Sequence, residues 1–195
     1  MRDSDQRGAP ALMSTEPGST VSLSSERKTY VCGTCGQRHH GLPLSFAAEF
    51  PDPYANVKRD ERDMRCVIGS DQCIIDRQFF FIRGCLEIPV LGREDAFLWG
   101  LWATVREEVF DEISACWELQ GRENSHGPFK GRLANSLSIY PETLNLKLRI
   151  TLQPVGQRPL FFIEEGEHLL AQEQSVGITE GRAMELASLL LHQVK

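Results

Sequence analysis

The sequence predicts a single α+β domain in which an antiparallel sheet of about five or six strands is covered by three helices. One observation behind this is the stretch from Gly69 to Val90, the densest run of branched and aromatic residues in the chain. The stretch is apolar on both faces, as expected of strands in the middle of a sheet. The other observation is residues 144–152, where leucine and isoleucine alternate with polar residues, which is typical of a strand with one face in water.

The central stretch is predicted to form a hairpin. Its two apolar segments are separated by a polar break at residues 76–78, which indicates a turn. Ile75 and Phe80 are predicted to lie inside the sheet, nearly inaccessible to solvent. Phe81 is expected to face the opposite side from Phe80, because successive residues of a strand alternate. Gly84 is expected to mark a bulge or a close approach of another part of the chain.

Two further strands complete the predicted sheet. Residues 97–104 form one of them, with Trp99 and Trp102 on opposite faces unless a bulge at Gly100 brings them together. Residues 159–164 form the other, and we expect this strand to pair in antiparallel fashion with the alternating strand that precedes it.

The predicted helices follow from apolar residues that recur at three- and four-residue steps. Thr104 and Glu107 have the spacing of a capping box for the second helix, and Thr179 is the expected cap of the third. Cys116 lies on the apolar stripe of the second helix, so we expect a buried small hydrophobic residue rather than a reactive thiol. The three helices are predicted in residues 54–66, 105–119 and 180–192.

The N-terminal segment differs in composition from the rest. Residues 1–27 are rich in Ser, Thr, Gly and Pro, which predicts a disordered leader before one domain at residues 28–195. The first residues lack the apolar core of a secretory signal, so a cytoplasmic location is expected. No apolar run approaches the roughly 20 residues that a membrane span requires.

A Cys-x-x-Cys pair followed by glycine, Cys32 to Gly36, has the form of a zinc knuckle. In a reducing compartment, cysteines act as thiols or metal ligands rather than disulfides. We therefore predict a structural zinc bound by Cys32, Cys35 and His39, since the histidine lies within reach of the same turn. His40 fits the spacing of a four-ligand knuckle as well, but the fourth position of that pattern is a serine. Other candidates for completing the site are His40, Cys66, Cys73 and Cys85.

Two alternatives to a zinc site stay open. A thioredoxin-like redox pair needs a helix that begins directly after the motif, and residues 37–43 are a poor helix start. The second alternative is a knuckle-like turn that holds no metal. The chain has no second Cys-x-x-Cys pair, which is the main argument against a complete site of the four-cysteine type.

Several strings of the chain form a distinctive set: CGTCGQRHHGLPLSF at 32–46, SDQCIID at 70–76, FFFIRGCLEIPV at 79–90, FLWGLW at 97–102, YPETLNLK at 140–147 and HLLAQEQSVGI at 168–178. Together they resemble a bacterial family known only as a domain of unknown function, DUF2199. The resemblance spans about residues 30–193 and leaves the leader outside it. It carries no established activity, cofactor or partner. It does imply that Cys32, Cys35, His39 and the Gly69–Val90 stretch belong to a common pattern.

The predicted function is a small cytoplasmic binding or adaptor protein with a structural zinc knuckle. Formal net charge of −6 argues against non-specific nucleic-acid binding, although it still allows a local basic patch. A protein partner is compatible with the sequence, whereas a membrane is not expected. A serine-hydrolase elbow, a phosphate-binding glycine loop and a dinucleotide fingerprint are all absent from the sequence. The alternatives are an enzyme with a catalytic metal or thiol (Cys73 or Cys85), and a partner-neutralising protein of the toxin-immunity kind.

Overall fold

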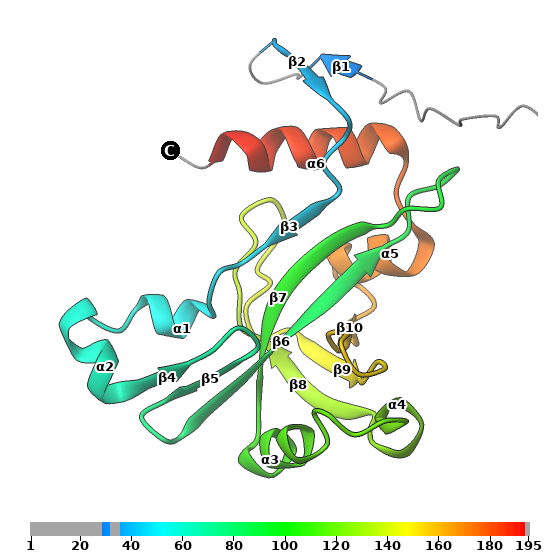
Figure 1. The fold of residues 1–195 in the computed structure, drawn as a ribbon. Coiled ribbons are helices and arrows are strands. Elements are labelled where there is room, and N and C mark those ends of the chain that lie inside the picture. Colours follow the sequence, from blue (N-terminus) through cyan, green and yellow to red (C-terminus); the bar gives the residue numbers. More distant parts are fainter. Residues whose placement is uncertain (1–28, 32–35, 194–195) are drawn as a thin grey trace, which may run out of the picture.

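The computed structural model describes residues 29–31 and 36–193 (Figure 1). The predicted leader lies outside these residues. The strands are β1 Thr29–Val31, β2 Arg38–His40, β3 Ser45–Ala47, β4 Cys66–Ile68, β5 Gln72–Ile75, β6 Phe79–Ile88, β7 Phe97–Val105, β8 Phe129–Leu133, β9 Lys147–Thr151 and β10 Leu160–Ile163. The helices are α1 Asp52–Ala55, the 3-10 turn η1 Arg59–Glu61, α2 Arg62–Arg65, α3 Glu107–Ala115, α4 Arg122–Ser125, α5 Leu169–Val176 and α6 Glu180–Gln193.

The α+β class is confirmed, but the main sheet is mixed rather than antiparallel. It has eight strands in the order β3-β7-β8-β9-β10-β6-β5-β4, and β6 also pairs with β7. Strands β6 to β10 therefore close into a five-stranded barrel. Five successive antiparallel strands alternate in direction, so the first and the fifth run the same way and their closing pair, Leu160 with Cys85, is parallel. The edge strand β3 also pairs with β7 in parallel.

The predicted hairpin at the centre of the chain is confirmed. Strands β5 and β6 pair from Gln72 with Ile82 to Ile75 with Phe79. Asp76 and Arg77 turn the chain with φ of 53° and 55°, and the Gln78 amide donates to the Ile75 carbonyl at 3.1 Å. Positive φ at both positions matches the right-handed twist of the two strands.

Gly84 marks a close approach, as predicted. A Cβ atom at this position would lie 2.3 Å from the ring of Phe161, which belongs to β10. Real Cβ atoms essentially never come this close to a non-bonded heavy atom. The missing side chain of Gly84 therefore lets Phe161 fill the barrel interior against β6, next to the parallel pair that closes the barrel.

Both faces of β6 are covered at Phe80 and Phe81, near the start of the strand. Ile75 and Phe80 expose only 4% and 8% of their surface, as the sequence predicts, and Phe81, which faces the opposite side, exposes 2%. Phe80 faces the barrel core, and its ring centroid lies 5.3 Å from that of Phe110 on α3. Phe81 belongs to a second cluster outside the barrel, which includes Trp102. Trp99 packs in the barrel core, so the two tryptophans lie on opposite faces, as predicted.

The predicted helices differ in outcome. The third helix is confirmed as α6, and the Thr179 hydroxyl accepts the Arg182 amide at 3.2 Å. The second is confirmed only as the shorter α3, and its predicted capping box is wrong. Thr104 is still in β7, paired with Phe81, so the N-cap residue is Arg106, without a side-chain cap.

The prediction of one continuous helix at residues 54–66 is wrong. The segment forms α1, η1 and α2 and then enters strand β4. The Arg62 side chain donates to the carbonyls of Val57 at 3.1 Å and Ala55 at 3.2 Å, oxygens that a continuous helix would bond to its own amides. Cys66 pairs with Ile75. The helical segment therefore ends where the pairing of β4 with β5 begins, although the apolar spacing typical of a helix continues beyond that point.

None of the helices in the described part of the chain is both long and apolar enough to cross a membrane.

Candidate functional site

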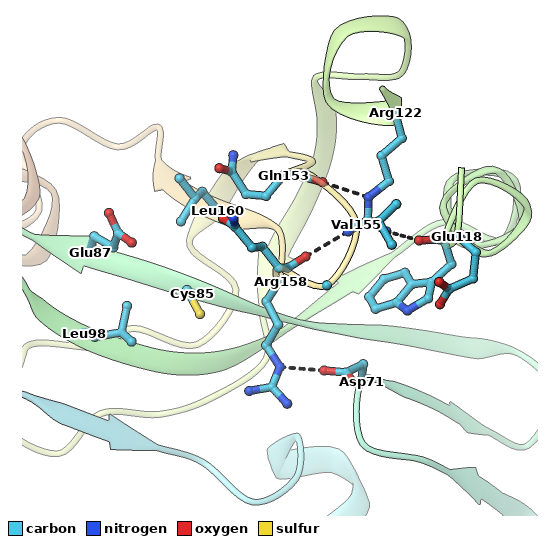
Figure 2. A pocket seen from close by; sticks show the side chains of 13 residues that line it. Asp71, Cys85, Glu87, Leu98, Glu118, Arg122, Gln153, Val155, Arg158 and Leu160 are labelled. Carbon is cyan, nitrogen blue, oxygen red and sulfur yellow. Dashed lines mark hydrogen bonds and ion pairs between the residues drawn. The ribbon is translucent and has the colours of Figure 1, made fainter. Parts of the chain in front are cut away.

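An open pocket of about 610 Å³ lies against the outer face of β6 (Figure 2). Its walls come from segments that are distant in the sequence. Cys85 and Glu87 of β6 form the floor, and Asp71 of the β4–β5 turn lies on one side. The β9–β10 loop, residues 153–158, and the segment between α3 and α4 form the rest.

A buried arginine holds two of these walls together. Arg122 is only 1% exposed. Its Nε donates to the Gln153 carbonyl at 2.8 Å, and its Nη2 donates to the Gln157 carbonyl at 2.8 Å. Nη1 donates to the carbonyl of Trp117, whose ring centroid lies 5.1 Å from the guanidinium carbon. A buried charge must be hydrogen-bonded to be tolerated, so these carbonyl bonds fix the loop to the end of α3.

An ion pair crosses the other side of the pocket. Arg158 Nε lies 2.5 Å from Asp71 Oδ1, which joins the β9–β10 loop to the β4–β5 turn (Figure 2). Burial acts to raise the pKa of Asp71. The hydrogen bonds from Ser70 and Arg158 oppose burial and hold this pKa below its ordinary value. Asp71 is therefore a carboxylate at neutral pH.

Cys85 presents a thiol in this pocket. It is partly exposed, and its side chain lies between Glu87 and Arg158 in Figure 2. Burial raises the pKa of the thiol, and the charge of Arg158 lowers it without cancelling the effect of burial. The thiol form therefore predominates at neutral pH. Because the thiolate is the nucleophile, Cys85 lacks the electrostatic activation typical of catalytic cysteines.

Two other cysteines are core residues. Cys73 has no exposed surface, and burial raises the pKa of its thiol to about 12. Cys116 is 3% exposed, which confirms its prediction as a buried hydrophobic residue.

Cys73 and Cys85, both candidates for completing the zinc site, lie too far apart to bind one ion. Cys73 pairs with Phe81, four residues before Cys85 on the same strand, so both cysteines lie on one face of the sheet. Four residues of β-strand extend about 13 Å. The two sulfurs are thus not brought together, because ligands of one zinc each lie about 2.3 Å from the ion.

The predicted zinc ligands can be placed only in part. Cys32 and Cys35 lie outside the described residues, and so do the side chains of His39 and His40. The backbone on either side of the Cys-x-x-Cys pair is described, and Val31 pairs with Arg38 in a two-stranded hairpin. Within the part of the chain that the structure describes, no group of three His, Cys, Asp or Glu side chains could hold a metal ion.

Sequence reasoning missed the main features of the pocket. Arg122 lies in a polar stretch that resembles a solvated loop, and Arg158 follows the Gly156 turn. The Asp71–Arg158 contact joins residues far apart in the sequence. No local pattern predicts such a contact, because it depends on closure of the barrel.

Residues 31–178 match a family described as "Uncharacterized protein conserved in bacteria (DUF2199)". The chain belongs to this family. No match was found among curated proteins. No solved structure matches either. Membership of DUF2199 therefore brings no activity with it, and the function must be argued from the site.

Proposed function

We propose that this DUF2199 protein is a small cytoplasmic binding protein that takes a polar small molecule in the pocket beside Cys85. The observation that carries the proposal is the pair of cross-links made by Arg122 and by Asp71–Arg158. They fix the pocket walls without any ligand. A site that is already ordered loses less conformational entropy on binding, so more of the contact energy appears as affinity.

The lining indicates the chemistry of the ligand. Glu87 and Glu118 supply acceptors, while Arg158 supplies donors. Leu98 and Leu160 add apolar surface to the lining. Such a combination suits a compact molecule with groups of both charges and a small apolar part.

Trp117 allows a direct test. Trp99 is 3% exposed and Trp102 is fully buried, whereas Trp117 is partly exposed and lines the pocket. Protein labelled with 5-fluorotryptophan would be screened by 19F NMR against a library of amino acids and other small zwitterions. Binding in the pocket is expected to shift the Trp117 resonance alone and to slow alkylation of Cys85 by iodoacetamide.

Matched charge variants make the test specific. Glu87→Lys, on the pocket floor, is expected to abolish the shift. Glu108→Lys makes the same change on an exposed position of α3, outside the lining residues, and is expected to preserve the shift. A library without any compound that shifts Trp117, or hits that survive Glu87→Lys, would refute this pocket as the binding site.

We also propose that the N-terminal hairpin holds a structural zinc through Cys32, Cys35 and His39. His40 is the alternative to His39, and the fourth ligand of such a site is not assigned. The pairing of β1 with β2 supports this, because it brings the residues before and after the Cys-x-x-Cys pair next to each other. Gly36 supports it as well, since its φ of +69° is the conformation that such a turn requires after the second cysteine. The proposal expects about one zinc per chain by mass spectrometry, lost in Cys32→Ser and Cys35→Ser.

An enzyme with a catalytic thiol is the second candidate, because Cys85 is accessible in the pocket. The raised pKa of this thiol counts against it. A protein of the toxin-immunity kind is favoured less, since such a protein would bind through an acidic surface and needs no pocket.

A further inference from the structure

Cations dominate the outer face of strands β8 and β9. Lys130 is paired directly with Arg149, and Arg132 is paired directly with Lys147. All four side chains are exposed. Like charges directly opposite each other on a sheet are destabilising. Although the chain has a formal net charge of −6, four positive charges lie together on this face. Their mutual repulsion destabilises the sheet.

Carboxylates lie at the edges of this face, and Glu87, Glu94 and Asp95 line a pocket together with Arg149 and Phe162. Lys147 Nζ lies 3.7 Å from Glu165 Oε1, and Glu164 lies at the rim of the same surface. Among the described residues, no carboxylate forms an ion pair with Lys130, Arg132 or Arg149. Arg132 donates instead to the Asn145 carbonyl at 3.1 Å. Three of the four cations therefore have no ion-pair partner among the described residues, and their charge is available to an anionic ligand.

The barrel core fixes the orientation of the four cations. Phe129, Leu133, Leu148 and Ile150 alternate with them and are buried in the barrel. Gly131 lies between Lys130 and Arg132, and a Cβ there would come within 2.7 Å of Ile150 Cδ1. The cations consequently cannot turn inward without a shift of the whole register, which would expose the core.

The same face is hollowed and carries an aromatic platform. A shallow depression of about 370 Å³ is lined by Arg106, Lys130, Arg132 and Lys147. Beside it, the Arg149 guanidinium lies 4.3 Å from the centroid of the Phe162 ring, to which it is paired across β9 and β10. Stacked arginine and aromatic groups are surfaces on which nucleobases stack.

We propose that this face, defined by Lys130, Arg132, Lys147 and Arg149 with Phe162, binds single-stranded nucleic acid. The two rows of cations are two residues apart along the strands, about 7 Å. Each of the four cations contacts one phosphate of an extended strand. A base stacks on the Arg149–Phe162 pair. The aromatic platform favours nucleic acid over an acidic peptide, which has no base to stack. The net charge of the whole chain argues against nucleic-acid binding only because it sums acidic and basic residues that lie on different faces of the protein.

Fluorescence anisotropy of the full-length protein with labelled 12-nucleotide oligo-dT and oligo-U tests the proposal between 50 and 200 mM salt. Four phosphate contacts predict a slope of log K against log salt of about −3. Lys130→Gln with Arg132→Gln should lower affinity roughly ten-fold and reduce the slope to about −1.5. Phe162→Leu keeps an apolar side chain without the aromatic ring and should also lower affinity roughly ten-fold.

The control variant replaces one lysine and one arginine at another place on the surface. Lys58→Gln with Arg59→Gln, both exposed and outside this face, should leave affinity and slope unchanged. Thermal unfolding separates binding from folding, because relief of like-charge repulsion should keep or raise the Tm of the Lys130/Arg132 variant. Three results would overturn the proposal: no salt-dependent binding, equal loss in the control, or equally tight binding of a polyglutamate peptide of the same charge.

Discussion

Three consecutive phenylalanines begin strand β6 in three different environments. Phe79 is 53% exposed, Phe80 is 8% exposed in the barrel core, and Phe81 is 2% exposed in the cluster outside the barrel. Replacing each in turn with alanine removes the same atoms from neighbouring positions. The series therefore separates burial from strand propensity, which is the same in all three variants.

The expected magnitudes follow from burial. Truncation of a buried phenylalanine costs about 3–5 kcal/mol, through lost transfer energy and an unfilled cavity. For a chain of this length, about 2–4 °C of Tm corresponds to 1 kcal/mol, so Phe80→Ala and Phe81→Ala should each lower the Tm by about 6–20 °C. A substitution as exposed as Phe79→Ala should cost at most about 1 kcal/mol.

Urea unfolding followed by circular dichroism would measure the free energy of unfolding of each variant. Similar large losses for Phe80→Ala and Phe81→Ala, with a small loss for Phe79→Ala, are expected of a sheet that is covered on both faces. A small loss for Phe81→Ala would refute the second cluster as a true core. Equal losses for all three variants would refute burial as the cause.

Three further predictions concern the barrel and the pocket. Gly84→Ala should destabilise the fold by about 1–3 kcal/mol in urea unfolding, because its Cβ meets the Phe161 ring; a neutral effect would contradict this close approach. Arg122→Met should accelerate amide exchange in residues 153–157 through loss of the carbonyl bonds, and unchanged exchange would show that they do not hold the loop. Asp71→Asn should lower the Tm at pH 7. The native pKa of Asp71 is lowered, so its contribution to stability is fully present above the unfolded pKa and is lost as the pH falls through the native pKa. A Tm difference from wild type that does not shrink as the pH is lowered below the ordinary pKa of aspartate would contradict this.

Local patterns in the sequence determined much of the secondary structure. The hairpin at Asp76 and Arg77, the two faces of β6 and the cap of α6 at Thr179 were predicted from adjacent residues. Turn chemistry, strand alternation and helix capping depend on neighbours in the chain, so the sequence contains the information directly. The zinc site at Cys32 and Cys35 stays a prediction of the same local kind.

Only the tertiary structure decided the closure of the barrel, the division of residues 54–66 into short helices, and the burial of Arg122. The first and the third depend on partners far away in the sequence, Leu160 beside Cys85 and the loop carbonyls around the Arg122 guanidinium. The second depends on pairing across the β4–β5 hairpin, where Cys66 lies beside Ile75. The same holds for the cation face, since Lys130 and Arg132 look like ordinary surface residues until β9 brings Arg149 and Lys147 opposite them. The alternation of side chains along a strand determines which face of the sheet each residue occupies. Which residues lie beside it on that face depends on the neighbouring strands, and their pairing forms only in the folded protein.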